Sequence, residues 1–173
     1  MTDRYGSAVY ELPNDLDVLI TREFEAPIDL VFDALTKPEH MSRWFPPSGC
    51  EMKECTIDLR VGGEYHQVFV TEDGNECSFR GTYLQIEPPT RTVETWVFEG
   101  RPHLDAVETV ELQESNGVTT MTIRLTYRDK ASRDEDMKSN EDIQGESSGQ
   151  QQSFDKLEDL LKELVATEGA VAQ

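Results

Sequence analysis

Hydrophobic and polar residues alternate along much of the middle of this chain, as they do in half-buried β-strands. The alternation is clearest in residues 118–127, VTTMTIRLTY, where every second side chain from Met121 onward is apolar or aromatic. Similar segments are LDVLITREF, EYHQVFV, ECSFRGTYLQI, RTVETWVF and AVETVEL. Turn sequences rich in Gly, Pro, Asn and Asp separate the later segments. We therefore predict a meander of antiparallel strands with one face in the core.

Helical spacing of apolar residues occurs at both ends of this strand-rich region. Residues 28–36, IDLVFDALT, follow Pro27 and predict a helix, which Pro38 ends. A second short helix is expected from Pro38, leading to the aromatic pair of residues 44–45. Near the end of the chain, Phe154, Leu157, Leu161 and Leu164 recur at steps of three and four. This spacing predicts a long amphipathic helix.

The flanks of the chain lack such patterns. Residues 1–15 are polar and aperiodic, so we expect a flexible N-terminal arm, and residues 166–173 are expected to form a flexible tail. Residues 16–165 then form a single domain, which suits a chain of 173 residues. The Gly, Ser and Gln content of residues 141–153 is compatible with either a linker or the start of the last helix.

A sheet with one apolar face and a single helix with one apolar stripe bury those surfaces against each other. We therefore predict an α+β fold in which a curved antiparallel sheet of about six or seven strands wraps around the C-terminal helix. Small residues occupy the first half of the expected helix and bulky ones follow from Phe154. Two of the small residues are Gly145 and Gly149. Small side chains leave volume unfilled, which predicts a cavity between that half and the sheet.

The charge of the chain excludes several classes of partner. A formal net charge of -19 repels phosphate groups, so we expect no binding to nucleic acid. No apolar segment is long enough for membrane insertion, and the first residues show no secretory signal, so a cytoplasmic location is expected. The acidity reflects either solubility or a high-salt habitat. Three cysteines without a CxxC pair indicate neither disulfides nor a zinc site.

Candidate site residues are mostly aromatic. Trp44 and Phe45 form either a rim for an apolar ligand or ordinary packing, and Trp96 is expected in the core or at the cavity. The side chains of Tyr65, Phe69, Phe79 and Tyr83 fall on neighbouring strands and can form one aromatic wall. That wall is core if the helix covers it and pocket if the helix is held away.

One acidic residue falls on the inward face of a predicted strand. In AVETVEL the apolar residues Ala106, Val110 and Leu112 define this face, and Glu108 lies among them. A carboxylate there is desolvated unless it is paired, although a residue near a strand end can also reach solvent. The histidines, His40, His66 and His103, are isolated and show no metal-ligand spacing. We expect no metal and no cofactor.

Several segments together resemble the activator of heat-shock protein 90 ATPase homologue family, of the START-like (SRPBCC) superfamily. They are ITREFEAPIDLVFDALTKPEHMSRWF, DLRVGGEYH, GTYLQIEPPTRTVETW and RDEDMKSNEDIQGESSGQQQSFDKLEDLL, the last with glycines 145 and 149 ahead of a Ser-aromatic-Asp run. The resemblance covers residues 16–165. It implies the helix-grip fold, also called START-like or Bet v-like, and favours helix over linker for residues 141–153.

The resemblance does not select one function, because related folds carry unrelated activities. Our first hypothesis is noncatalytic binding of a small, largely apolar ligand in the cavity, as a monomer or homodimer. The second is activation of a chaperone ATPase, which follows from the resemblance alone. The third is a cyclase or dehydratase that uses Glu108, His66 or a tyrosine as acid and base.

Overall fold

The computed structural model describes residues 4–139 and 149–171. Its strands form one eight-stranded antiparallel sheet in the order β1-β2-β8-β7-β6-β5-β4-β3. The strands are β1 (Val9–Glu11), β2 (Asp17–Phe24), β3 (Glu51–Ile57), β4 (Glu64–Val70), β5 (Glu76–Glu87), β6 (Arg91–Phe98), β7 (Ala106–Ser115) and β8 (Val118–Tyr127). From β3 to β8 each strand pairs with the next along the chain, which confirms the predicted meander.

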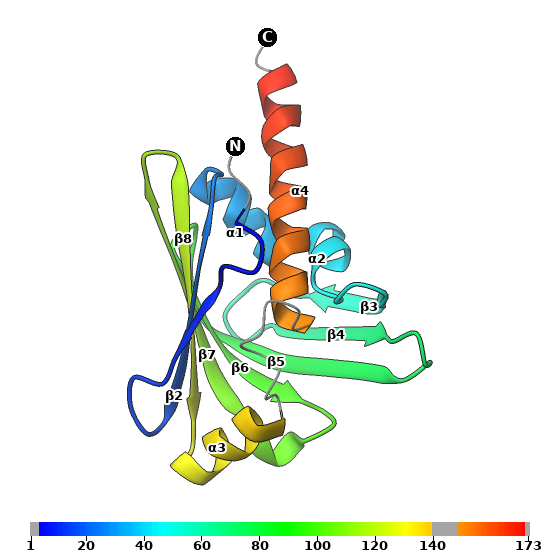
Figure 1. Ribbon diagram of the computed structural model, residues 1–173, viewed down its shortest axis with the longest axis vertical. Coiled ribbons are helices and arrows are strands. Elements are labelled where there is room, and N and C mark those ends of the chain that lie inside the picture. The colour runs from blue at the N-terminus through cyan, green and yellow to red at the C-terminus, as the bar shows by residue number, and fades with distance from the viewer. Residues whose placement is uncertain (1–3, 140–148, 172–173) are drawn as a thin grey trace.

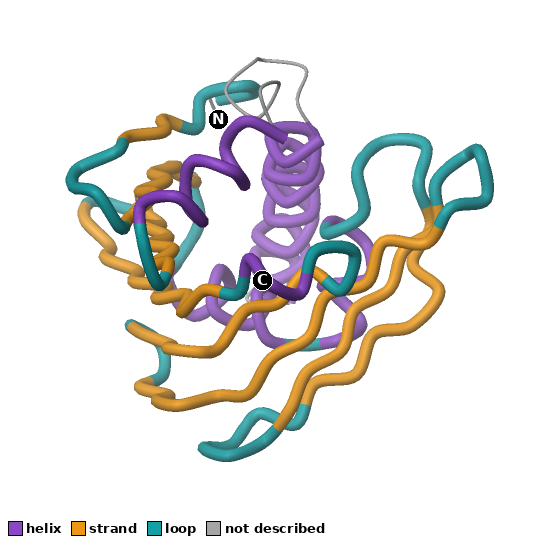
Figure 2. The backbone as a smooth tube through the Cα atoms, turned by 90° about the horizontal axis from the view of Figure 1, so that it is seen from below, coloured by secondary structure: helices purple, strands orange, loops and turns teal. Residues whose placement is uncertain are grey.

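The sheet curves around one long helix, α4 (Gly149–Val171), as Figure 1 and the view in Figure 2 show. The apolar stripe of α4 packs against the concave face of the sheet, where Phe154, Leu157 and Leu161 are buried. Helices α1 (Ile28–Thr36) and α2 (Pro38–Trp44) have the bounds that the Pro residues indicated, and both contact α4. The predicted helix-grip architecture is therefore confirmed.

Two strands and one helix were absent from the sequence-based prediction. Strands β1 and β3 lie at the two edges of the sheet, and their burial patterns lack a fully buried face. Helix α3 (Lys130–Ser139) buries Arg133 and Asp136 in place of apolar side chains, so hydrophobic periodicity gives no sign of it. A short 3-10 turn, η1 (Pro102–Leu104), precedes β7 and contacts α3.

The ends of the chain also differ from the simple pattern. Within the segment expected to be a flexible arm, Ala8 is buried and exchanges two backbone-to-side-chain hydrogen bonds with Gln151 of α4 (3.2 and 3.0 Å). These contacts are polar and long-range, so a scan for apolar periodicity does not detect them. At the other end α4 continues to Val171, beyond the boundary expected at residue 165, and its residues 166–170 are exposed. No described helix is long and apolar enough to span a bilayer.

Candidate functional site

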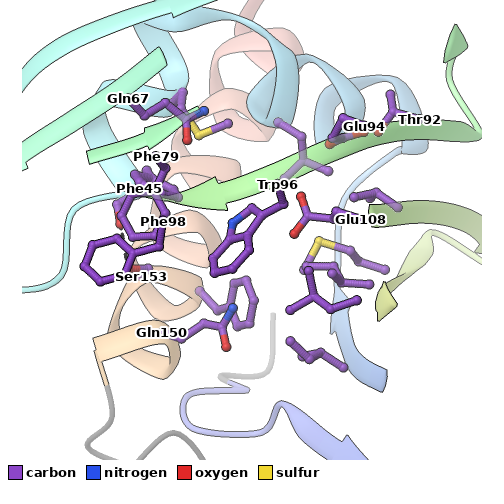
Figure 3. Close-up of a pocket in the computed structure, with 18 of the residues that line it drawn as sticks. Phe45, Gln67, Phe79, Thr92, Glu94, Trp96, Phe98, Glu108, Gln150 and Ser153 are labelled. Carbon is purple, nitrogen blue, oxygen red and sulfur yellow. Dashed lines mark hydrogen bonds between the residues drawn. The ribbon is translucent and has the colours of Figure 1, made fainter. Parts of the chain in front are cut away.

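A cavity of about 520 Å³ lies between α4 and the concave face of the sheet. Figure 3 shows its interior, with side chains converging from strands on one side and α4 on the other. The strands contribute every second residue, as in Thr92, Glu94, Trp96 and Phe98 of β6. Side chains alternate between the two faces of a strand, so the cavity-lining residues show which side chains of each strand point to the concave face.

The amino-terminal end of α4 forms one wall of the cavity. Gly149, Gln150, Ser153 and Phe154 line it, and the next apolar residues of the helix are buried in the core. A Cβ atom at Gly149 would lie 3.3 Å from Pro47 Cγ, so a larger residue there would press on the loop after α2. Gly145, the other predicted glycine, lies outside the described residues. The first described residues of α4 that border the cavity, Gly149, Gln150 and Ser153, are therefore small or polar.

The predicted aromatic wall is present as two groups of rings. Phe79 is central to the first, with ring centroids 6.0 Å from Phe69, 5.9 Å from Trp96 and 5.1 Å from Phe98. Tyr65 and Tyr83 form the second, 5.6 Å apart. All of these side chains line the cavity. Tyr65, Phe69 and Tyr83 are also buried, so the wall combines core packing with a face toward the cavity, and its contact with a ligand stays a prediction.

Trp44 and Phe45 combine packing with exposure to the cavity. Trp44 is buried and donates a hydrogen bond from Nε1 to the backbone oxygen of Ala34 (2.8 Å), which fixes its ring between α1 and α2. Phe45 packs edge-on against Phe69 and Phe79, with centroids 5.9 and 5.4 Å apart. Both side chains also line the cavity, and whether they contact a ligand stays a prediction.

Glu108 faces the cavity, as its place on β7 predicted, and it has an acidic partner. The register of β6 and β7 places Glu94 directly opposite Glu108. Figure 3 shows the Glu108 carboxyl group beside Trp96, with Glu94 next to Thr92. Desolvation raises the pKa of both carboxyl groups well above the ordinary range, and the proximity of Glu108 raises that of Glu94 further. The pair therefore holds one proton more readily than an exposed pair does.

The residues around this acid pair carry no compensating charge. No ion pair joins Glu94 or Glu108 to a Lys, Arg or His in the described ranges 4–139 and 149–171. Burial, together with the two carboxyl groups, raises the pKa of Tyr65 and of Tyr83, so both phenols stay protonated at neutral pH. The Tyr65 hydroxyl donates a hydrogen bond to the backbone oxygen of Thr95 (2.8 Å).

A second polar group lies on the cavity wall near α3. The Tyr127 hydroxyl donates a hydrogen bond to Asp136 Oδ2 (2.6 Å), and the Arg101 guanidinium lies 3.4 Å from Asp136 Oδ1. Arg101 also stacks over Phe98, with its Cζ atom 5.4 Å from the ring centroid. Here the charges of Asp136 and Arg101 compensate each other, although Arg101 Nη1 has no hydrogen-bond partner among the described residues. The two carboxyl groups on β6 and β7 have no such opposite charge beside them.

Sequence reasoning missed Glu94, the polar group at α3 and Gln67, a further residue of β4 that lines the cavity. Glu94 could have been found from the sequence, because in RTVETWVF it lies two residues before Trp96 and therefore on the same face of the strand. A charged residue on an aromatic face is unusual. Its pairing with Glu108 depends on the register between two strands, which alternation alone does not fix. The group at α3 joins residues from three separate elements and has no local signature.

Among the other candidate residues, His66 lies away from the cavity, whereas Cys77 is part of its lining. On the outer side of the sheet, His66 contacts Glu54 Oε1 (3.1 Å) through Nδ1 and Ser78 Oγ (2.8 Å) through Nε2. The Ser78 hydroxyl donates to Glu99, so it is part of a surface network. Burial raises the pKa of each of the three thiols, Cys50, Cys55 and Cys77. No cluster of metal-ligating side chains occurs within the part of the chain that the structure describes.

Solved structures with this fold come from several bacteria. A protein from Rhodobacter sphaeroides has a TM-score of 0.81 at 20% identity, over 91% of this chain and 99% of that one. One from Nitrosomonas europaea has a TM-score of 0.74 at 27% identity, over 90% and 99%. An AHSA1-like protein from Aeromonas hydrophila has a TM-score of 0.54 at 22% identity, over 73% and 88%. A comparison with curated proteins finds no match.

A family model agrees with this structural likeness. The model described as "Activator of Hsp90 ATPase homolog 1-like protein" matches residues 25–162. This range runs from the end of β2 into α4 and includes both carboxyl groups of the acid pair. The chain therefore belongs to the family of activator of Hsp90 ATPase homolog 1-like proteins.

Proposed function

We propose that this protein binds a small, largely apolar molecule in the cavity between α4 and the sheet. The observation that carries the proposal is the cavity of about 520 Å³, which lies within the usual size range of small-molecule sites. Its lining is mainly aromatic and aliphatic, with a few polar groups at defined places. This composition suits a ligand with an apolar body and a small polar part.

The architecture also supports this proposal. An unfilled apolar cavity weakens a protein, because the lining side chains lose contacts on one side. A larger residue on the α4 side could fill this space, yet Ser153, which lines the cavity, has a small side chain. An occupant would restore the missing contacts, and its binding would stabilise the folded state.

The proposal is tested by protein purified from its own host and analysed by native mass spectrometry. A bound mass that disappears on denaturation is the expected result. In parallel, melting temperatures are measured with a broad panel of lipids and metabolites, and a ligand is expected to raise them. The proposal is contradicted if the protein carries no bound mass and if no compound of the panel changes its melting temperature.

A pair of matched variants separates cavity binding from binding elsewhere. Val110→Phe places a larger side chain on the cavity wall, whereas Val107→Phe makes the same change on the exposed outer face of the same strand. Ligand affinity is expected to fall by about tenfold or more in Val110→Phe, because loss of about 1.4 kcal/mol of binding energy has that effect. Val107→Phe is expected to bind as the wild type does. Equal affinity in both variants would place the ligand outside the cavity.

The acid pair favours a second candidate, an enzyme of the cyclase or dehydratase type. Two carboxyl groups that share a proton can act as acid and base toward one substrate. If so, Glu108→Gln abolishes turnover of a substrate while the melting temperature is retained. Unchanged turnover removes Glu108 from any catalytic role.

A chaperone-related role remains an alternative that rests on the family's name. The described residues offer no separate observation in its favour. Chaperone ATP turnover measured with and without this protein tests it, and an unchanged rate counts against it. The cytoplasmic location and the monomeric or homodimeric state also stay predictions from the sequence.

A further inference from the structure

The acid pair leaves one acceptor atom inside the cavity without a partner. Glu94 is 8% exposed, and its Oε2 atom has no hydrogen-bond partner among the described residues. Buried polar atoms are nearly always hydrogen-bonded, so an unpaired carboxyl oxygen on a cavity wall marks a place where a donor is missing. Glu108 lies beside it on the neighbouring strand and also faces the cavity.

The ionisable groups that face the pair come from several elements. They are Tyr65 on β4, Tyr83 on β5 and Tyr127 on β8, and the cavity wall also carries Tyr10, Cys77, Arg91, Arg101 and Asp136. Arg91 and Arg101 already have acidic partners, Glu111 and Asp136 respectively. The described residues of α4 that line the cavity are uncharged. Negative charge on the pair is therefore not neutralised from any of these sides.

We infer that the ligand of this cavity carries a protonated amine, which donates hydrogen bonds to Glu108 and to the open oxygen of Glu94, while its apolar body lies against the aromatic wall. This inference rests on the proposed function and names the chemical class of the ligand. A cationic nitrogen supplies both the missing donor and the missing positive charge. With Glu94 protonated and Glu108 ionised, the pair carries one negative charge, which one amine neutralises.

Other head groups fit this place less well. A carboxylate or phosphate would bring a second negative charge next to Glu108 in a site where water screens poorly, and like charges repel strongly there. An alcohol can donate one hydrogen bond, but it leaves the charge of the pair uncompensated. Hydrogen bonds to charged groups are the stronger ones, which favours the amine over the alcohol.

The location of the shared proton follows from the surroundings of the two groups. A hydrogen bond between the two groups raises the pKa of Glu94 while lowering that of Glu108. Glu94 therefore keeps the proton and donates it toward Glu108, which carries the charge. A glutamine at position 94 can imitate this arrangement, because its amide NH₂ group can also donate to Glu108.

The test uses three compounds with one ring system and different head groups. They are 2-(1-naphthyl)ethylamine, 2-(1-naphthyl)ethanol and 1-naphthaleneacetate. Each is titrated into the full chain at pH 8 by calorimetry. We expect the amine to bind at least about tenfold more tightly than the alcohol, and the carboxylate to bind most weakly, because a hydrogen bond to a charged group contributes enough for such a ratio.

Three variants assign the preference to the pair. Glu108→Gln is expected to reduce the amine-to-alcohol ratio to about one, because the charge is lost. Glu94→Gln is expected to keep most of the ratio, and its loss would overturn the placement of the proton. Glu51→Gln makes the same change at an exposed position of the edge strand β3 and is expected to behave as the wild type.

The possible failures are distinguishable. If the alcohol or the carboxylate binds as tightly as the amine, or if Glu108→Gln keeps the preference, the amine inference is wrong while apolar binding stands. If none of the three compounds binds at millimolar concentration, the amine inference fails, and the proposed function fails with it only if native mass spectrometry and the melting-temperature panel also detect no ligand. The melting temperature of Glu108→Gln shows whether this variant is folded. Its affinity for the alcohol is expected to equal that of the wild type, which shows that the cavity is intact.

Discussion

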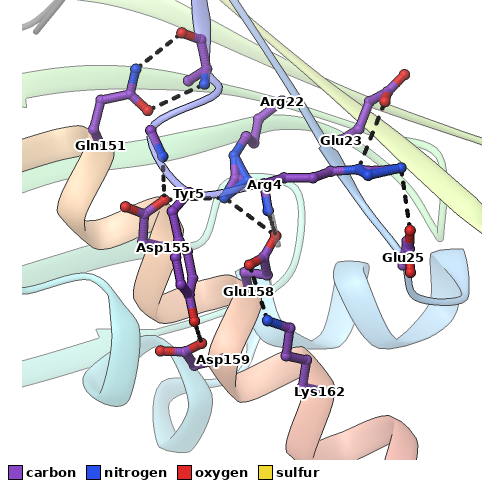
Figure 4. Close-up of polar contacts among 12 residues, drawn as sticks. Arg4, Tyr5, Arg22, Glu23, Glu25, Gln151, Asp155, Glu158, Asp159 and Lys162 are labelled. Atoms are coloured by element: carbon purple, nitrogen blue, oxygen red, sulfur yellow. Dashed lines mark hydrogen bonds and ion pairs between the residues drawn. The ribbon is translucent and has the colours of Figure 1, made fainter. Parts of the chain in front are cut away.

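Two groups of buried charges on the concave face of the same sheet differ in how the protein compensates them. Arg22 of β2 is 1% exposed, yet its Nη2 atom lies 3.1 Å from Asp155 Oδ1 and 3.6 Å from Glu158 Oε1 of α4 (Figure 4). Arg22 also lies over the ring of Phe24, 5.0 Å from its centroid. The acid pair of β6 and β7, in contrast, has no basic partner among the described residues.

The difference follows from where α4 lies. Opposite Arg22 the helix is close, and it brings its own acids to the sheet, while Arg4 and Tyr5 of the N-terminal segment close the outer side (Figure 4). Opposite Glu94 and Glu108 the cavity intervenes, so no side chain of the helix compensates the charge. The first cluster therefore holds α4 to the sheet, and we propose that the second binds a ligand.

The largest effect is expected from breaking the compensated cluster. Arg22→Met keeps much of the side-chain volume but leaves the Glu158 carboxylate, which is 5% exposed, with Lys162 as its remaining ion-pair partner. Removing one partner of a buried ion pair costs about 3 to 5 kcal/mol of unfolding free energy. Denaturation in urea measures this loss. A loss below about 1 kcal/mol would show that the cluster does not hold α4 to the sheet.

A change of the opposite sign is expected at the uncompensated pair. The folded state raises the pKa of Glu94, so it binds a proton more tightly than the unfolded chain does, and stability falls as the pH rises above the unfolded value of about 4.3. Glu94→Gln cannot ionise and escapes this loss. We expect it to be more stable than the wild type by about 1 to 3 kcal/mol at pH 8, and to show no advantage near pH 4.

Denaturation curves across that pH range check this prediction. Glu51→Gln serves as the control, because Glu51 is exposed on the edge strand β3. An advantage for Glu94→Gln that does not change with pH would mean that ionisation is not its cause.

A smaller effect is expected on ligand affinity when the pH falls. Protonation of Glu108 removes the charge that attracts the amine, and the pKa of this group is raised by desolvation. We therefore expect 2-(1-naphthyl)ethylamine to bind about tenfold more weakly at pH 5 than at pH 8. The affinity of the corresponding alcohol is expected to stay constant, and a parallel fall for both compounds would point to a general loosening of the fold.

The smallest effect is expected at the exposed edge of the compensated cluster. The Tyr5 hydroxyl donates a hydrogen bond to Asp159, and its ring lies under Lys162 at 5.0 Å. Tyr5→Phe keeps the ring and loses this bond, so the unfolding free energy is expected to fall by about 0.5 kcal/mol. A loss as large as that of Arg22→Met would mean that the N-terminal segment, and not the ion pair, fixes α4.

The sequence predicts the elements with strong apolar periodicity and misses those held by polar contacts. Alternation located β8 and the inward face that includes Glu108, and the spacing of Phe154, Leu157 and Leu161 located the buried part of α4. Helix α3 and the contacts of Ala8 with Gln151 are stabilised by buried polar groups, which a search for apolar periodicity does not detect.

The candidate site was predicted in outline for the same reason. The aromatic residues and Glu108 follow from strand parity, and all of them line the cavity. Arg22 also points to the concave face, because it alternates with Ile20 and Phe24 along β2. Glu94 does so as well, because it alternates with Trp96 along β6. A charged residue in an apolar series was overlooked at both places. Their partners, Asp155 and Glu108, depend on helix docking and strand register, which are properties of the assembled fold.

The central claim is that the space between α4 and the sheet holds a ligand with an amine beside the acid pair. A crystal structure of the protein saturated with 2-(1-naphthyl)ethylamine tests it most directly. We predict density for the ring against Trp96 and Phe79, with the nitrogen within about 3 Å of a Glu108 carboxyl oxygen. An empty cavity at saturating concentration, or a ring whose nitrogen points away from both carboxyl groups, would contradict the account.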